Sequence, residues 1–159
     1  MQNIKNFGIK SVLECGCGLG FYANWIQQET GITPKSVDLS EVAIERAKKL
    51  FPTLDFEVAD ITKELEQYAN YDCVLLSEII WYILPSLDSI LEVLKENFKG
   101  KYLMISQVFY KGQQKYGTEY FTSMKELIDY IPFELLGQCE ATLSTDTTIE
   151  STVIFKISE

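Results

Sequence analysis

The chain has 159 residues, of which 47% are hydrophobic and 23% are charged, as expected for one soluble globular domain. It carries 14 Lys and Arg against 23 Asp and Glu, giving a formal net charge of −9, and it has no His. This balance argues against a nucleic-acid partner, which needs clustered cations, and mildly favours a neutral or cationic small ligand, although an acidic surface that only maintains solubility explains the charge equally well.

Strand-like and helix-like segments alternate along the chain. Short apolar runs predict the strands, while helical spacing of apolar residues, Ser caps and flanking Gly or Pro delimit the helices. In chain order the predicted elements are strand 11–15, helix 19–29, strand 36–39, helix 40–51, strand 54–59, a short helix or turn at 62–68, strand 72–77, helix 85–100, strand 101–108, a long loop at 109–121, helix 124–131, and strands 133–144 and 148–157.

The last two strands, 133–144 and 148–157, are joined by a short polar turn and predict an antiparallel hairpin. Five α/β units precede this hairpin, and such units form parallel sheets through right-handed crossovers. No internal repeat, low-complexity segment or linker divides the sequence. We therefore predict a single α/β domain over residues 1–159.

The cysteines and the apolar segments limit the location of the protein. The cysteines form no C-x-x-C pair and no His is present, so we expect structural thiols and no metal site. The N-terminus lacks the apolar segment of a signal peptide, and the longest apolar stretch, 73–84, is too short to span a bilayer. We expect a cytoplasmic protein without membrane contact.

The most informative segment is Val12–Gly20, in which an apolar run leads into Glu14 and three alternating glycines. This pattern predicts a buried parallel strand that turns sharply into a helix. Gly16, Gly18 and Gly20 allow positive φ angles or the close approach of a ligand. Because ligands of open α/β sheets bind at the carboxyl ends of the strands, the segment predicts a nucleotide-type site.

Acidic side chains follow three successive strands: Glu14, Asp38 and Asp60. Crossovers bring these strand ends together at one edge of the sheet. A carboxylate after the second strand can accept hydrogen bonds from both ribose hydroxyls, each worth roughly 1.5–3 kcal/mol. Any one of these acids could instead cap a helix or lie in solvent, but three at matching positions favour a binding site.

This constellation resembles the class I S-adenosylmethionine-dependent methyltransferases. Residues 14–20 look like that family's acid-x-Gly-x-Gly-x-Gly motif, and residues 37–40 are similar to its ribose-binding motif. Residues 58–61 resemble the third motif, whose acid meets the adenine amino group, and residues 71–78 resemble the fourth, at the mouth of the active site. The resemblance covers nearly the whole chain.

The resemblance implies a Rossmann-like three-layer sandwich, with a mostly parallel seven-stranded sheet ending in an antiparallel β-hairpin. It implies S-adenosyl-L-methionine as the cofactor. The cofactor-binding residues that it implies are Glu14, Gly16, Gly18, Gly20, Asp38, Leu39, Asp60, Ile61 and Ser77.

A dinucleotide enzyme is an alternative, because Gly18, Gly20 and Ala23 also satisfy the pattern G-x-G-x-x-A, with Asp38 at a suitable distance along the chain. Two features argue against it. Glu14 would repel a pyrophosphate, whereas a sulfonium ligand with an ammonium group tolerates a carboxylate. The terminal hairpin also departs from the all-parallel sheet of dinucleotide-binding domains.

Residues 77–82 follow the fourth strand and face the methyl group if the donor lies over the glycine turn. We hypothesise that Glu78 binds or deprotonates the acceptor and that Tyr82 or Trp81 forms the pocket wall, with simple packing of both aromatic residues under the next helix as the alternative. Holding the reactants in line can supply roughly 7–11 kcal/mol without an acid or base, and a carboxylate can orient an amine or hydroxyl. Loop 109–121 is expected to border the same pocket.

The Ser-Glu-x-x-Trp-Tyr pattern of residues 77–82 resembles small-molecule N-methyltransferases such as the nodulation type, which acts on glucosamine-based oligosaccharides. The Asn-Pro-Pro-Tyr-like tetrad of nucleic-acid amino methyltransferases is absent there. We therefore expect methyl transfer to a small polar acceptor, an amine or hydroxyl. Related enzymes usually carry one or two helices before the first strand, where this chain has only about ten residues. A non-catalytic S-adenosylmethionine-binding module that partners another chain is therefore the alternative, and the oligomeric state is left open.

Overall fold

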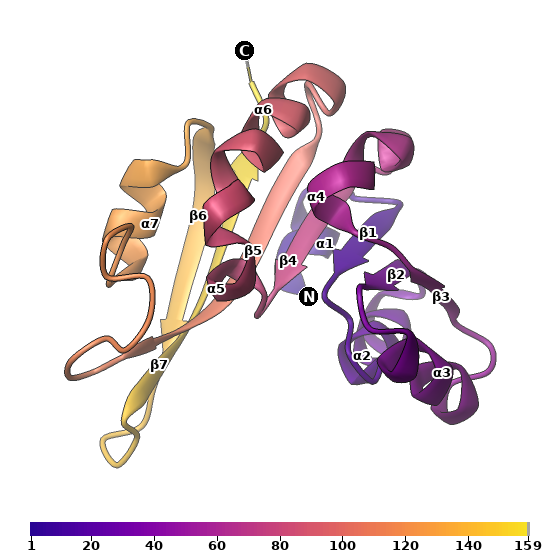
Figure 1. Cartoon of the computed structure of the whole chain (residues 1–159), viewed down its shortest axis with the longest axis horizontal. Helices are drawn as coiled ribbons and strands as arrows, with labels where there is room; N and C mark the ends of the chain where they lie inside the picture. Colours follow the sequence, from indigo (N-terminus) through magenta and orange to yellow (C-terminus); the bar gives the residue numbers. More distant parts are fainter. Residues whose placement is uncertain (159) are drawn as a thin grey trace.

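The computed structural model describes residues 1–158 as one seven-stranded sheet with helices on both faces (Figure 1). The strand order is β3-β2-β1-β4-β5-β7-β6. Strands β1 to β5 pair in parallel, whereas β7 pairs antiparallel with both β5 and β6. The strands are β1 (Val12–Cys15), β2 (Lys35–Asp38), β3 (Asp55–Val58), β4 (Cys73–Ser77), β5 (Tyr102–Tyr110), β6 (Glu134–Ala141) and β7 (Thr148–Lys156). The predicted α/β class, Rossmann-like sandwich and terminal hairpin are confirmed.

The helices agree with the sequence expectations at most positions. They are α1 (Gln2–Asn6), α2 (Phe21–Thr30), α3 (Glu41–Leu50), α4 (Ile61–Glu64), α5 (Ile80–Ile83), α6 (Leu87–Asn97) and α7 (Met124–Tyr130), with 3-10 turns η1 (Leu65–Tyr68) and η2 (Leu84–Ser86).

Three features were not predicted. Helix α1 has one buried residue, Ile4, and therefore shows no apolar period. Helix α5 lies within a continuous apolar run and has no side-chain cap. Strand β5 extends to Tyr110, beyond the predicted end at Val108, because Tyr110 still pairs with Thr148 of β7. Pairing with a distant strand therefore overrides the local sequence signal at this point.

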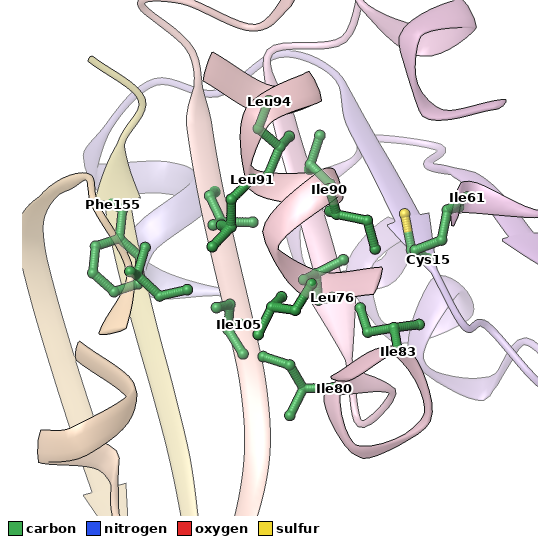
Figure 2. Close-up of a cluster of buried hydrophobic side chains, with 14 of the residues drawn as sticks. Cys15, Ile61, Leu76, Ile80, Ile83, Ile90, Leu91, Leu94, Ile105 and Phe155 are labelled. Carbon is green, nitrogen blue, oxygen red and sulfur yellow. The ribbon is translucent and has the colours of Figure 1, made fainter. Parts of the chain in front are cut away.

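One face of the sheet is covered by α4, α5, α6 and α7, which share one apolar core with it. Figure 2 shows side chains of α6 lying over Leu76 of β4 and Ile105 of β5. The buried residues of α6 recur at helical spacing, which gives this helix a single apolar face. They are Leu87, Ile90, Leu91 and Leu94.

The opposite face is covered by α1 and α2. Ile4 of α1 and Ile26 of α2 share a core with the alternate side chains of the central strands, including Val12 and Leu75. Helix α3 packs beside α2 in a smaller core that includes Phe56 of β3. Since successive strand residues point to opposite faces, the central parallel strands are apolar on both sides.

The glycine turn between β1 and α2 is held by backbone contacts. The N–H groups of Gly16 and Cys17 both donate to the Val37 carbonyl of β2, at 2.8 and 3.1 Å. Gly20 precedes α2 with φ +81, and a Cβ there would lie 2.4 Å from Cζ of Phe56. Glycine is therefore required at this position both by the backbone conformation and by the nearby ring.

Glu14 lies inside the sheet, between β2 and β4, and is fully buried. One carboxylate oxygen, Oε2, accepts a hydrogen bond from the Ser36 hydroxyl at 2.7 Å, and Oε1 has no partner among the described residues. Burial raises the pKa of Glu14 from 4.5 to about 7, against the opposing effect of the Ser36 hydrogen bond.

The close contact at Gly20 predicts a larger stability loss than backbone strain alone. Gly100 has a similar φ of +78, but a Cβ there would meet nothing within 4 Å. We expect Gly100→Ala to lower the unfolding free energy by about 1–2 kcal/mol, and Gly20→Ala to lower it by roughly a further 1–3 kcal/mol because the methyl group meets the Phe56 ring. Urea unfolding of both variants measures the difference, and equal losses would contradict the contact.

The buried carboxyl group of Glu14 predicts a pH-dependent stability. Its folded-state pKa lies above its usual value, so stability falls as pH rises from about 4.5 to about 7 and the loss remains above that range. A shift of this size corresponds to roughly 3 kcal/mol. We expect the unfolding free energy of Glu14→Gln to exceed that of the parent by an amount of that order at pH 8. At pH 5 this difference should be below about 1 kcal/mol.

Urea unfolding at both pH values measures this gap. The exposed Glu92→Gln variant on α6 is the matched control and should show no comparable change between the two pH values. A Glu14→Gln gap that is the same at pH 5 and pH 8 would contradict a buried, proton-binding Glu14.

Candidate functional site

A cavity of about 590 Å³ lies beside the glycine turn, where the carboxyl ends of β1, β2 and β4 and the segment after β3 contribute to its wall. We call it the glycine-turn cavity. Its lining residues are Gly16, Val37, Asp38, Leu39, Ala59, Asp60, Ile61, Thr62, Ser77, Glu78, Ile79, Tyr82 and Ile83. This volume is in the range of cavities that bind a cofactor-sized molecule.

Asp38 connects this cavity to the glycine turn. Its Oδ2 accepts a hydrogen bond from the Gly18 N–H at 2.9 Å, and its Oδ1 accepts one from the Ser40 N–H at 2.8 Å. The carboxylate therefore holds the turn and the start of α3 in place while it lines the cavity. Ser40 in turn caps α3 by accepting from the Ala43 N–H.

Asp60 is held in its charged form at the start of α4. Its carboxylate pairs with the Lys63 ammonium at 2.7 Å and accepts from the Thr62 hydroxyl at 2.6 Å and the Thr62 N–H at 3.1 Å. The pair with Lys63, followed by the Thr62 hydroxyl, lowers the pKa of Asp60 to about 2. The residue therefore remains an acceptor at neutral pH.

A second cavity, of about 610 Å³, adjoins the first. We call it the aromatic cavity, because four of its lining residues are Trp or Tyr. Its lining residues are Glu78, Trp81, Tyr82, Gln107, Val108, Tyr110 and Tyr116. Glu78 and Tyr82 line both cavities, so these two side chains lie at their junction.

Glu78 has a strained backbone and a well-held carboxylate. It is the one non-glycine residue of 1–158 with positive φ, +57, and its N–H donates to the Ser106 carbonyl. Its carboxylate accepts from the Val108 N–H at 3.2 Å and from the Ser106 hydroxyl at 3.4 Å. Burial is the main cause that raises the pKa of Glu78. Strain combined with a shifted pKa is typical of functional positions.

Trp81 forms a rigid part of the aromatic cavity. Its ring packs against Phe109 and Phe121, with centroids 5.6 and 5.4 Å away. Gln107 is 2% exposed. In the amide orientation that satisfies its hydrogen bonds, its side-chain oxygen accepts from the Trp81 indole N–H and from the Val108 N–H. Trp81 thus packs in the core and lines the cavity, whereas Tyr82, at 84% exposed, does not pack under the next helix.

Six of the nine predicted cofactor-binding residues line the glycine-turn cavity: Gly16, Asp38, Leu39, Asp60, Ile61 and Ser77. Glu14, Gly18 and Gly20 do not line it. Glu14 is buried within the sheet, Gly18 donates to Asp38, and Gly20 lies against Phe56.

Sequence reasoning missed Thr62 and Ile83 in the first cavity, and Gln107 and Val108 in the second. Val37, Ala59 and Ile79 lie within the segments 37–40, 58–61 and 77–82 that it placed at the site, but it did not name them as site residues. A polar Gln107 within an apolar strand was a signal that could have drawn attention to the second cavity.

Residues 1–158 contain no helix of the length and apolarity that a membrane span requires.

Comparisons with known proteins agree with this geometry. Residues 8–149 match the model of a family described as a methyltransferase domain. Among solved structures, the methyltransferase domain of bacterial CtHen1-C is 15% identical and superposes with a TM-score of 0.76, covering 99% of this chain and 94% of that one. The PH0226 protein from Pyrococcus horikoshii OT3 is 12% identical with a TM-score of 0.74, covering 99% and 86%.

TehB from Haemophilus influenzae is 21% identical with a TM-score of 0.69, covering 99% of this chain and 60% of that one. A search of curated sequences found no significant match. None of these matches bears out the narrower resemblance to nodulation-type N-methyltransferases. The family match and the shared fold show that the chain belongs to the family of S-adenosylmethionine-dependent methyltransferase domains.

Proposed function

We propose that this single domain transfers a methyl group from a donor in the glycine-turn cavity to a small polar acceptor, an amine or hydroxyl, in the aromatic cavity. The observation that carries the proposal is the junction of the two cavities at Glu78 and Tyr82. A donor and an acceptor held on either side of this junction would meet there, and such positioning is the main requirement of an in-line displacement.

The glycine-turn cavity fits the donor in its chemistry. Gly16 lines the cavity, and a Cβ there would lie 1.8 Å from Cγ2 of Ile79. Glycine therefore lets the backbone of the turn pack against Ile79 at the cavity wall. Asp38 supplies a carboxylate suited to ribose hydroxyls, and Ile61 and Ile83 supply apolar surface suited to a purine. When bound, S-adenosylmethionine supplies an electrophilic methyl group on a sulfonium sulfur.

Asp60 and Ser77 extend the polar part of the same wall. We infer that Asp60, charged at neutral pH, accepts a hydrogen bond from the adenine amino group, as the family motif implies. Glu14 is buried and does not line the cavity. We therefore infer that it acts on the donor only indirectly, through the glycine turn that follows it.

Glu78 and Tyr82 are the candidate catalytic residues. The Glu78 carboxylate, fixed by two donors from β5, can orient an acceptor hydrogen or take up its proton. Tyr82 projects into solvent at the junction and can close over a bound acceptor. The second cavity favours catalysis over a binding module without activity, because binding the donor alone requires only the first.

Replacing Asp38 tests the donor site. Asp38→Ala should weaken S-adenosylhomocysteine binding about tenfold or more, because the ribose hydroxyls lose a charged acceptor and the glycine turn loses its bond from Gly18. Calorimetric titration of the parent and the variant measures the change. Asp129→Ala, an exposed acid on α7 outside both cavities, is the matched control and should bind like the parent.

Thermal melting of each variant shows whether it is folded. A folded parent that binds no S-adenosylhomocysteine would overturn the proposed function, and an unchanged affinity in a folded Asp38→Ala variant would remove Asp38 from the donor site.

A further inference from the structure

We propose that the aromatic cavity selects an arylalkylamine, which enters as an ammonium ion on a flat apolar body and is held and deprotonated by Glu78. This inference rests on the proposed function and names the acceptor class that the site takes. Four observations support it: the charge of the lining, its aromatic rings, the buried Gln114 bonded to the backbone of two of the lining tyrosines, and the fixed carboxylate of Glu78.

The charge of the lining disfavours anionic acceptors. Glu78 is the one charged residue among those that line the aromatic cavity, and no Lys or Arg lines it. The neighbouring charge on β7, Glu150, is also acidic and pairs in register with Val108. Lys111 and Lys115 line a neighbouring surface cavity that shares Tyr110, where the Lys111 ammonium donates to the Leu143 carbonyl. The Lys115 ammonium lies on the Tyr110 ring, 5.7 Å from its centroid, so the other three rings are the ones available to a ligand cation. Within the lining itself, a phosphate or carboxylate would therefore meet only the like charge of Glu78.

The rings of the lining favour a cation on an apolar body. Trp81, Tyr82, Tyr110 and Tyr116 surround the cavity, and aromatic faces attract ammonium groups while their area binds flat apolar groups. Trp81 is fixed in the core, whereas Tyr82 and Tyr116 are 84% and 61% exposed. The cavity therefore combines one rigid aromatic wall with two exposed rings.

The loop after β5 places Tyr116 by specific contacts. Gln114 is buried, accepts from the Tyr110 N–H at 3.4 Å and donates to the Tyr116 carbonyl at 3.0 Å, so it ties the two lining tyrosines together. At Gly117, φ is +66 and a Cβ would lie 2.8 Å from Cζ3 of Trp81. The loop thus packs directly on the rigid wall, and this close approach requires glycine.

Glu78 supplies the acid–base step. The N–H bond of the entering ammonium breaks, the proton forms an O–H bond on the Glu78 carboxylate, and the electron pair stays on nitrogen as the nucleophile. Burial, which disfavours the charged carboxylate, makes it a stronger proton acceptor than a solvated one. An alcohol gives up its proton far less readily than an ammonium whose pKa is about 10, so a carboxylate suits the amine better.

The test compares four probes: 2-phenylethylamine, its neutral analogue 2-phenylethanol, its anionic analogue 3-phenylpropanoate, and butylamine, which lacks the ring. Each is titrated calorimetrically into the protein with S-adenosylhomocysteine bound, and N- or O-methyl products formed with S-adenosylmethionine are measured by mass spectrometry. We expect 2-phenylethylamine to bind at least about tenfold tighter than each of the others and to be N-methylated.

Two variants and a control assign the effect to residues. Glu78→Gln should lower 2-phenylethylamine affinity and N-methylation about tenfold or more, with S-adenosylhomocysteine affinity within about twofold of the parent. Tyr116→Ala should lower the amine affinity about threefold. Glu92→Gln, which changes the same net charge on exposed α6, should match the parent in every measurement.

Each result bears on one claim. Equal or tighter binding of the alcohol or the carboxylate, or binding of no probe by a protein that binds S-adenosylhomocysteine, overturns the acceptor class and leaves the donor site standing. A folded protein that does not bind S-adenosylhomocysteine overturns the proposed function. In that case titration of the four probes alone still decides whether the aromatic cavity selects the amine.

Discussion

The attachment of the glycine turn to the end of β2 is the constraint on which the rest of the site depends. Two N–H groups of the turn share the Val37 carbonyl, and the next residue of β2, Asp38, accepts from Gly18. These bonds satisfy backbone donors that would otherwise be unpaired where the strand becomes a helix. They also bring the turn against the carboxyl end of the neighbouring strand, which is where the cavity opens.

Glu14 shows the cost of this arrangement. A carboxyl group in the middle of a buried parallel sheet has one hydrogen-bond partner, Ser36, where its two oxygens could accept several. The group responds by binding a proton more tightly, so near neutral pH it divides between the neutral and the charged form.

Local sequence patterns predicted most of the strands and helices of the fold. Apolar alternation located the strands, and Ser40 and the residues around Pro132 marked helix boundaries that the structure confirms within a few residues. The resemblance to the methyltransferase motifs located six lining residues of one cavity, among them the strand-end acids Asp38 and Asp60. Helix α5 and the last two residues of β5 were not predictable, because contacts with β7 and the core determine them. Loop 109–121 was expected to border the acceptor pocket, and its Tyr116 lines the aromatic cavity, but the Gln114 contact that holds Tyr116 was not predictable. Such long-range contacts leave no periodic signal in the sequence.

The strained backbone at Glu78 connects the fold to the chemistry. Between β4 and α5 the chain must turn within two residues, and a positive φ at Glu78 achieves this turn at a cost of about 1–3 kcal/mol. A glycine would remove the strain but also the carboxylate. The hydrogen bonds from Val108 and Ser106 hold the side chain across the neighbouring strand, so the same residue ends β4 and stands between the two cavities. Retaining a side chain at a position that favours glycine is what a functional role for that carboxylate would require.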